Sequence, residues 1–300
     1  MDKKIIILGF AGISFLLSSC GSEQESANNI QELSDNEIAQ ELDETEEVSA
    51  QKMFYALPSP FEVASLLKAS GIEFEDGMLN SVDNVSKYEN TTSKALNLGV
   101  YGADVSFTSI YDKTQHTMLY LSSIKKLADD LGISAAFDGE TMTRLESSRD
   151  SRDSLQIIVA QAYGMANAYL KENSRSSSSS LILAGGWIEG VHIATSMLDP
   201  NEPNEDLIEL IADQRFSLQN LISLLEINAE EEEIASLISE LKELDTIYAE
   251  VNDEESNAVT ASESENGTMI LGGGSSIDVS SEVLVKITSK VNQIRSKIIG

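Results

Sequence analysis

The stretch that decides the fold is Ala95-Leu96-Asn97-Leu98-Gly99-Val100-Tyr101-Gly102-Ala103-Asp104. Small residues recur in it at every fourth position, at Ala95, Gly99 and Ala103, and this spacing places them on one face of an α-helix. A glycine inside a helix costs about 1 kcal/mol relative to alanine, so its use on such a stripe needs a compensating gain. Close approach of another helix backbone would provide that gain. The stretch therefore predicts a buried helix at the centre of a helical domain.

Two further segments show the same spacing of small residues. The first contains Ala162, Gly164, Ala166 and Ala168, and the second contains Gly186, Gly190 and Ala194. We expect these three helices together to form the centre of the domain. In the last of them, residues 181–198, Glu189 is the only charged residue. Because Glu189 and His192 would be costly in lipid, and Gly185, Gly186 and Gly190 fit a closely packed helix, we interpret this segment as a buried helix rather than a membrane span.

The rest of the chain also has helical periodicity. Apolar residues recur with a period near 3.6 rather than alternating, which is typical of helices. We predict helices near residues 60–70, 91–111, 115–131, 138–147, 151–172, 178–198, 204–226, 230–250 and 280–298. Turn residues separate them at Gly71, Gly77, Gly132 and residues 199–204, and residues 252–279 are predicted to be a long loop. The predicted fold is all-α, a single multi-helix bundle or helical array spanning residues 53–300.

The N-terminus has the three parts of a secretory signal. Lys3 and Lys4 form a short cationic region, residues 5–17 are mostly apolar, and small residues then lead to Cys20. The apolar part is too short to cross a hydrocarbon core of about 30 Å at about 1.5 Å per residue. Residues 1–19 are therefore predicted to be a cleaved signal peptide.

Leu17-Ser18-Ser19-Cys20 resembles the lipobox of bacterial lipoproteins. The resemblance implies that signal peptidase II cuts before Cys20 and that its thiol carries a diacylglycerol. Cys20 is the sole cysteine of the chain, so an intramolecular disulfide is excluded. An ordinary signal peptide that happens to contain a cysteine is the alternative. Gly21 follows, where an aspartate would be the usual inner-membrane retention signal, so the resemblance favours the outer membrane, with the domain facing the periplasm or the cell surface.

The charge of the chain limits its partners. The formal net charge is −30, and such a surface repels phosphate backbones, so we predict no nucleic-acid partner. Residues 20–52 are rich in Asp and Glu, and Lys52 is their only basic residue. This segment has too few apolar side chains to fold alone, and we predict a disordered acidic tether there.

Three stretches, residues 55–60, 96–104 and 185–190, are similar to those of a family of uncharacterised Bacteroidota lipoproteins. The similarity covers most of residues 53–225. It implies a helical lipoprotein and no particular activity.

Polar residues on the predicted central helices are the candidate site. Asn97, Tyr101, Asp104 and Thr108 share one helical face, as do Tyr163 with Asn167 and Glu189 with His192. If these faces converge, Asp104 and Glu189 are the ionisable members of a buried cluster, and their pKa values would be raised. Such a cluster would bind a cation or an amine, or it would be a structural hydrogen-bonded network with His192, a Lys or an Arg beside Glu189.

Sequence motifs for catalysis or metal binding are not found. Glu189-Gly190-Val191-His192 is a single Glu-x-x-His unit, whereas di-iron bundles need two such units and two more glutamates. The chain has no Gly-x-Ser-x-Gly motif and no phosphate-binding loop with a lysine. We therefore predict no catalytic residue, no metal and no cofactor, although two carboxylates alone would suffice for a glycosidase.

Three hypotheses follow for function. The first is a lipid-anchored, non-enzymatic helical module that binds a protein partner or a small polar ligand. The second is a carboxylate-based hydrolase or cation-binding protein that uses Asp104 and Glu189. The third is a purely structural component of the cell envelope.

Overall fold

The computed structural model describes residues 60–75, 77–136, 144, 152–199, 201, 203–254, 260–263, 269–272 and 276–300. These residues belong to one compact unit, Ala50–Gly300. The described residues do not include the predicted signal peptide, Cys20 or the predicted tether. The helix predicted at residues 138–147 also lies outside them, apart from residue 144.

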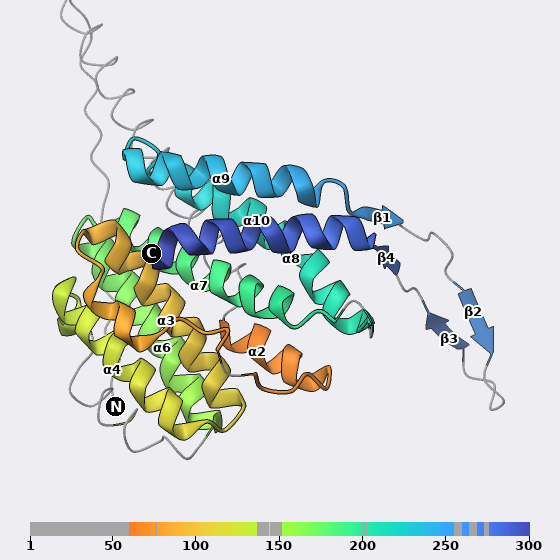
Figure 1. Ribbon diagram of the computed structural model, residues 1–300, viewed down its shortest axis with the longest axis horizontal. Helices are drawn as coiled ribbons and strands as arrows, with labels where there is room; N and C mark the ends of the chain where they lie inside the picture. Colours follow the sequence, from red (N-terminus) through yellow and green to blue (C-terminus); the bar gives the residue numbers. More distant parts are fainter. Residues whose placement is uncertain are drawn as a thin grey trace, which may run out of the picture. The chain divides into compact units, whose positions relative to one another are not determined.

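The described part of the chain is all-α, as predicted (Figure 1). Its α-helices are α2 (Pro60–Ala69), α3 (Thr91–Ile110), α4 (Thr114–Asp130), α6 (Arg152–Glu172), α7 (Ser176–Ser196), α8 (Glu205–Glu226), α9 (Glu232–Tyr248) and α10 (Ser281–Ile299). Two short 3₁₀ helices, η1 (Val82–Ser86) and η2 (Ser134–Ala136), lie in the connections. None of the described helices is long and apolar enough to span a membrane.

Local signals in the sequence set the ends of several helices. The Asn90 side chain accepts a hydrogen bond from the Ser93 amide at 2.7 Å, and Asn204 caps α8 through the Leu207 amide at 3.0 Å. These are N-caps, which satisfy backbone donors that have no partner within the helix. Gly71 and Gly132 follow α2 and α4 with φ of 78° and 67°, a left-handed conformation that favours glycine.

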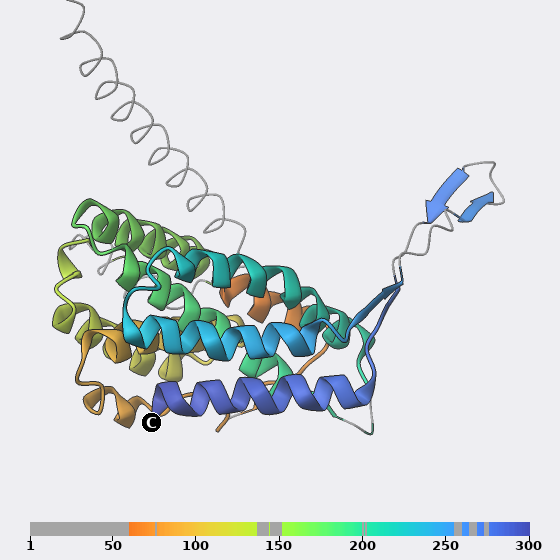
Figure 2. The ribbon, with the colours of Figure 1, turned by 90° about the horizontal axis from the view of Figure 1, so that it is seen from above.

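Helices α3 and α7 form the centre of the bundle. Every residue of α3 from Ala95 to Ile110 is buried, and so is every residue of α7 from Ser178 to Thr195 except Leu183. Helices α2, α6 and α10 contact both, α4 packs on α3, and α8 packs on α7. Helix α9 lies against α8 and α10 (Figure 2). The central pair is thus surrounded by protein, and the polar side chains of both helices are buried together with the apolar ones.

Glycine allows the two central backbones to touch. A Cβ at Gly99 would lie 1.9 Å from the Ile182 carbonyl oxygen, and one at Gly185 would lie 1.9 Å from the Leu96 carbonyl oxygen. Both obstacles are backbone atoms, so no side chain can move aside to make room. The prediction that small residues bring helices together is confirmed at Gly99 of α3, where an added Cβ would also lie 2.7 Å from the Gly186 nitrogen. On α7 the glycine without room for a Cβ is Gly185, which the predicted stripe did not include, and a Cβ at Gly190 would meet only Val63 Cγ1, at 3.9 Å. The prediction is wrong for Gly164 of α6, where nothing lies within 4 Å of an added Cβ.

The predicted loop at residues 252–279 contains short strands. They are β1 (Asn252–Glu254), β2 (Thr260–Glu263), β3 (Met269–Gly272) and β4 (Ser276–Asp278). Strand β1 pairs antiparallel with β4, with Asn252 opposite Asp278, and β2 pairs antiparallel with β3, with Thr260 opposite Gly272. The two arms of this connection satisfy each other's backbone groups, which a polar and glycine-rich sequence does not reveal.

Gly99→Ala tests the central contact. Because the added methyl meets backbone, α3 and α7 must separate, and we expect a loss of about 3 kcal/mol or more in the free energy of unfolding. Urea unfolding followed by circular dichroism measures this loss. Gly164→Ala is the matched control, and it should raise stability by up to about 1 kcal/mol because alanine is the better helix former. A Gly99→Ala protein as stable as the Gly164→Ala protein would contradict the close contact.

Candidate functional site

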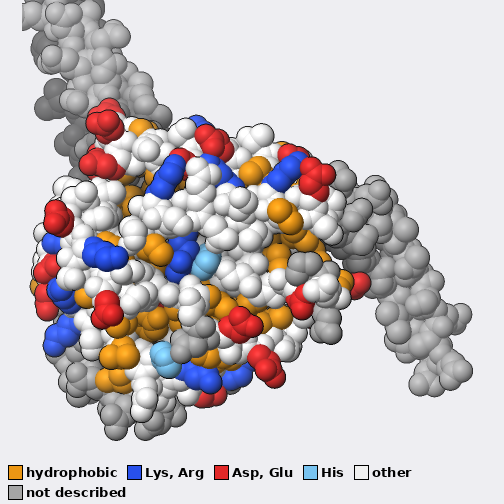
Figure 3. Space-filling model, viewed as in Figure 1, with side chains coloured by type: hydrophobic (Ala, Val, Ile, Leu, Met, Phe, Trp, Pro, Cys, Tyr) orange, Lys and Arg blue, Asp and Glu red, His pale blue; other side chains and the backbone are white. Residues whose placement is uncertain are grey.

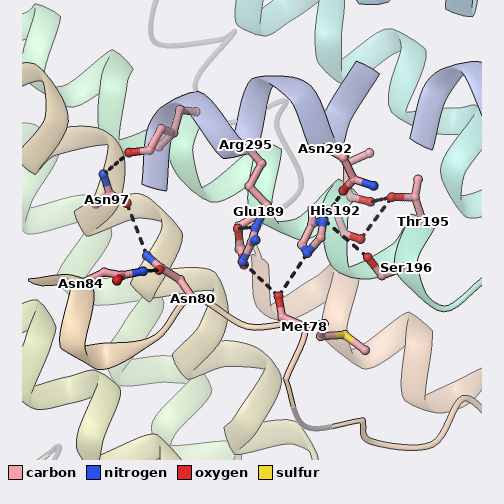
Figure 4. Close-up of polar contacts among 12 residues, drawn as sticks. Met78, Asn80, Asn84, Asn97, Glu189, His192, Thr195, Ser196, Asn292 and Arg295 are labelled. Carbon is pink, nitrogen blue, oxygen red and sulfur yellow. Dashed lines mark hydrogen bonds and ion pairs between the residues drawn. The ribbon is translucent and has the colours of Figure 1, made fainter. Parts of the chain in front are cut away.

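The predicted cluster of polar residues lies where α3, α7 and α10 meet the loop after Gly77 (Figure 4). Asp104 comes from α3, Glu189 and His192 from α7, and Asn292 and Arg295 from α10. We call these five residues, with the Met78 carbonyl, the buried polar network. Asp104 and Glu189 are both 0% exposed.

Glu189 and Arg295 form a two-bond ion pair at the centre of the network. Arg295 Nε donates to Glu189 Oε2 at 2.6 Å, and Nη2 donates to Oε1 at 2.7 Å. Nη2 also donates to the Met78 carbonyl oxygen at 3.0 Å. Burial acts to lower the pKa of Arg295, but the hydrogen bonds that it donates to Glu189, together with the charge of that carboxylate, outweigh burial and leave the pKa raised. The pair joins α10 to α7 and to the loop at Met78, with both carboxylate oxygens engaged.

Asp104 lies beside this ion pair. Among the described residues, neither Oδ1 nor Oδ2 has a partner at normal distance and angle. Burial, and then the neighbouring Glu189 carboxylate, raise the pKa of Asp104 well above its usual range, while Arg295 acts in the opposite direction. One guanidinium cannot neutralise two carboxylates in a dry interior. We infer that Asp104 is protonated at neutral pH, which leaves the three groups with no net charge.

His192 connects the same three elements. Its Nδ1 lies 2.7 Å from Asn292 Oδ1, and its Nε2 lies 3.1 Å from the Met78 carbonyl oxygen. Burial lowers the pKa of His192, although Glu189 acts to raise it. A neutral imidazole has one N–H, so it donates either to the Met78 carbonyl oxygen or to Asn292 Oδ1, and it bridges both residues when the Asn292 amide is turned to present Nδ2 to the ring.

Asn97 and Tyr101, which lie two turns and one turn before Asp104 on α3, extend the polar region. Asn97 Nδ2 donates to the Ile298 carbonyl oxygen of α10 at 2.8 Å, and Asn97 Oδ1 accepts from Asn80 Nδ2 at 3.4 Å. The Tyr101 hydroxyl donates to the Ser81 carbonyl oxygen at 2.8 Å. These contacts tie α3 to the last turn of α10 and to the loop before η1.

Asn167 of α6 does not join the network. Its Oδ1 accepts a hydrogen bond from Ser179 Oγ at 2.6 Å, near the start of α7. Ser179 lies ten residues before Glu189 on the same helix, a distance of about 15 Å along its axis. Tyr163 lies on α6 as well, and its side chain is outside the described residues.

In one of its two interpretations of the cluster, sequence reasoning placed His192, a Lys or an Arg beside Glu189, but it did not identify Arg295. Arg295 and Asn292 occupy positions three apart on α10, so they share a helical face, and this spacing was the available signal. Nothing in the sequence indicates the contribution of the Met78 carbonyl group, because every residue has a backbone carbonyl.

The geometry of the network is structural rather than reactive. Both carboxyl groups are sealed from solvent, and Glu189 uses both oxygens on Arg295, so neither has room for a substrate. This burial argues against a hydrolase that uses Asp104 and Glu189. Among the described residues, no three His, Cys, Asp or Glu side chains gather as a metal site would require.

Asp104→Asn tests the protonation of the buried carboxyl. Below about pH 4, the pKa of Asp in the unfolded chain, the protonated carboxyl contributes its full stabilisation. Above that pH the unfolded chain releases the proton and the folded protein keeps it. The free energy of unfolding therefore falls by about 1.4 kcal/mol per pH unit, until the pH reaches the folded pKa. Asparagine cannot ionise, so the free energy of unfolding of the Asp104→Asn protein should not show this fall with pH. Urea unfolding between about pH 5 and about pH 7 should show the variant gaining on the wild type as pH rises. Parallel curves for the two proteins would mean that Asp104 is ionised in the fold.

A double-mutant cycle tests whether Asp104 can replace Glu189. In Glu189→Gln, Asp104 is the remaining carboxyl beside Arg295, and we expect it to ionise and pair with the guanidinium. Glu189→Gln combined with Asp104→Asn leaves that guanidinium buried without a carboxylate, which costs about 3 kcal/mol or more. The loss in the double variant should therefore exceed the sum of the single effects, as measured by urea unfolding at pH 7. Additive effects would show that the two carboxyl groups are independent.

Comparison with protein-family models, with curated proteins and with solved structures gives no match for this chain, so its function must be argued from its own residues.

Proposed function

We propose that this protein is a lipid-anchored lipoprotein of the cell envelope, whose helical domain is a non-enzymatic binding or interaction module. The observation that carries the proposal is Leu17-Ser18-Ser19-Cys20, placed directly after a short cationic region and an apolar segment. Two or three acyl chains hold a protein firmly to a membrane, whereas one chain gives only reversible binding. Gly21 after the cysteine supports the outer membrane as the destination.

The acidic sequence after Cys20 supports the same proposal. A tether that begins at the lipid and repels anionic headgroups would keep the domain away from the membrane surface. Its reach would follow flexible-chain statistics and would let the domain meet a partner tens of ångströms away. The sealed carboxyl groups support a binding or structural role over hydrolysis, because they provide no accessible acid or base.

A purely structural envelope component is the second candidate. The buried polar network favours it to the extent that the network locks helices together and leaves no reactive group exposed. A saturable ligand site on the domain would favour the binding module instead.

Cys20→Ser tests the anchor. We expect the wild-type protein to begin at Cys20 and to carry acyl chains, because the thiol is the group that accepts the lipid, and we expect the variant to carry none. Intact-mass analysis of protein extracted from the membrane fraction measures both the start site and the acyl mass. Ser19→Ala is the matched control, since it keeps a small residue before the cysteine and should stay acylated. A wild-type protein that is unacylated, or that starts at another residue, would contradict the proposal.

A further inference from the structure

A hollow on the surface lies between the first turns of α3 and α9 and the last turn of α10, and we call it the α3–α9–α10 groove. Its volume is about 570 Å³, which falls within the range of roughly 300–1,000 Å³ for small-molecule sites. It is lined by Asn90, Thr92, Ser93, Leu96, Glu232, Glu233, Ser236, Leu237, Glu240, Ile294, Lys297 and Ile298. The buried polar network contributes none of these side chains.

The floor of the groove is apolar. It consists of Leu96 from α3, Leu237 from α9, and Ile294 and Ile298 from α10, each of which also belongs to the core. Three helices thus hold the floor in place, and a ligand with an aliphatic body would cover side chains that are already fixed.

The free charges at the rim are negative. Glu232 and Glu233 are exposed in the first turn of α9. No ion-pair partner is found for either among the described residues.

The single lysine of the groove is already neutralised. Lys297 pairs with Glu240, which also accepts a hydrogen bond from Lys290 at 2.6 Å. Hydrogen bonds from these two lysines lower the pKa of Glu240, so it stays ionised within this internal pairing. The charge offered to a ligand is therefore that of Glu232 and Glu233.

An anionic ligand fits the groove poorly. The first backbone amides of a helix have no partner within it and can bind an anion. At the start of α3 the Asn90 side chain already accepts from one of them, that of Ser93, at 2.7 Å. The net charge of −30 would also repel an anion before it arrived. The lining thus combines an apolar floor with an acidic rim, which complements an amphipathic cation.

We propose that the α3–α9–α10 groove binds a small organic cation with an aliphatic body. Its ammonium group lies at Glu232 and Glu233, and its methylene chain covers Leu96, Leu237 and Ile298. The assignment rests on the proposed binding function and names the ligand class that this surface takes.

Three probes with the same eight-carbon body separate charge from apolar contact. They are 1,8-diaminooctane, which is cationic, 1,8-octanediol, which is neutral, and suberate, which is anionic. Titration calorimetry with the purified mature protein should give saturable one-to-one binding of the diamine. The diol should bind at least about tenfold more weakly, because it lacks the charge-assisted hydrogen bonds, and suberate should not bind.

Variants then locate the site. Glu232→Gln with Glu233→Gln should weaken diamine binding at least about tenfold, since it removes both rim charges. The matched control is Glu205→Gln with Asp206→Asn, which removes the same charge from the first turn of α8, outside the groove, and should leave binding unchanged. Ser236→Phe keeps every charge but fills the groove, and it should abolish binding.

The outcomes are distinct. If the substitutions at Glu232 and Glu233 weaken binding no more than those at Glu205 and Asp206, the diamine is attracted only by the overall negative charge of the protein. That result would overturn the proposal. Binding that survives Ser236→Phe, or equal affinity for all three probes, would overturn it as well. Acylation at Cys20 is read from the mass of the same preparation, so a failure of the groove and a failure of the anchor are recorded separately.

Unfolding curves of the variants complete the design. Glu232, Glu233 and Ser236 are exposed, so their substitution should leave the urea midpoint close to that of the wild type. A loss of binding at an unchanged midpoint is the result expected for a ligand site.

Figure 3 shows acidic and basic side chains side by side along the upper part of the molecule, where α9 and α10 lie.

Discussion

The fold depends on the contact between the backbones of α3 and α7. Gly99 and Gly185 leave no space for a Cβ, so each helix lies in the groove of the other, and the remaining helices are arranged around this pair. Such an approach buries nearly every side chain on both helices, including polar ones. Asp104 and Glu189 are consequently placed in the interior by the same packing, and the protein needs a cation there. Arg295 of α10 provides it.

The sequence allowed the helices to be predicted because their signals are local. Periodic apolar residues, the caps Asn90 and Asn204 and the turn glycines Gly71 and Gly132 act within a few residues of the feature that they determine. The choice of the central helices followed from small residues, yet Gly164 shows the limit of that argument. Its spacing matches that of Gly99, but whether a neighbouring backbone comes close depends on the whole bundle.

The sequence allowed the two acidic residues of the candidate site to be predicted, but not the groups that they contact. Asp104 and Glu189 stand out as charges within apolar helices, so their meeting was a reasonable hypothesis from the sequence. Arg295 lies 106 residues from Glu189, and the Met78 carbonyl is 217 residues from Arg295. Pairing over such separations is set by tertiary packing. The α3–α9–α10 groove is also beyond sequence reasoning, because its lining comes from three helices that are far apart in the chain.

The position of Arg295 has a consequence for biosynthesis. The guanidinium that compensates Glu189, and the Ile298 carbonyl that accepts from Asn97, belong to α10, which follows α3 and α7 in the chain. A domain generally folds as a unit, and synthesis proceeds from its N-terminal side. Helices α3 and α7 are therefore made before α10, and the charge of Glu189 stays uncompensated until α10 has been made. The native interior can form only when α10 has joined it, and a chain truncated before Arg295 lacks the cation that Glu189 needs.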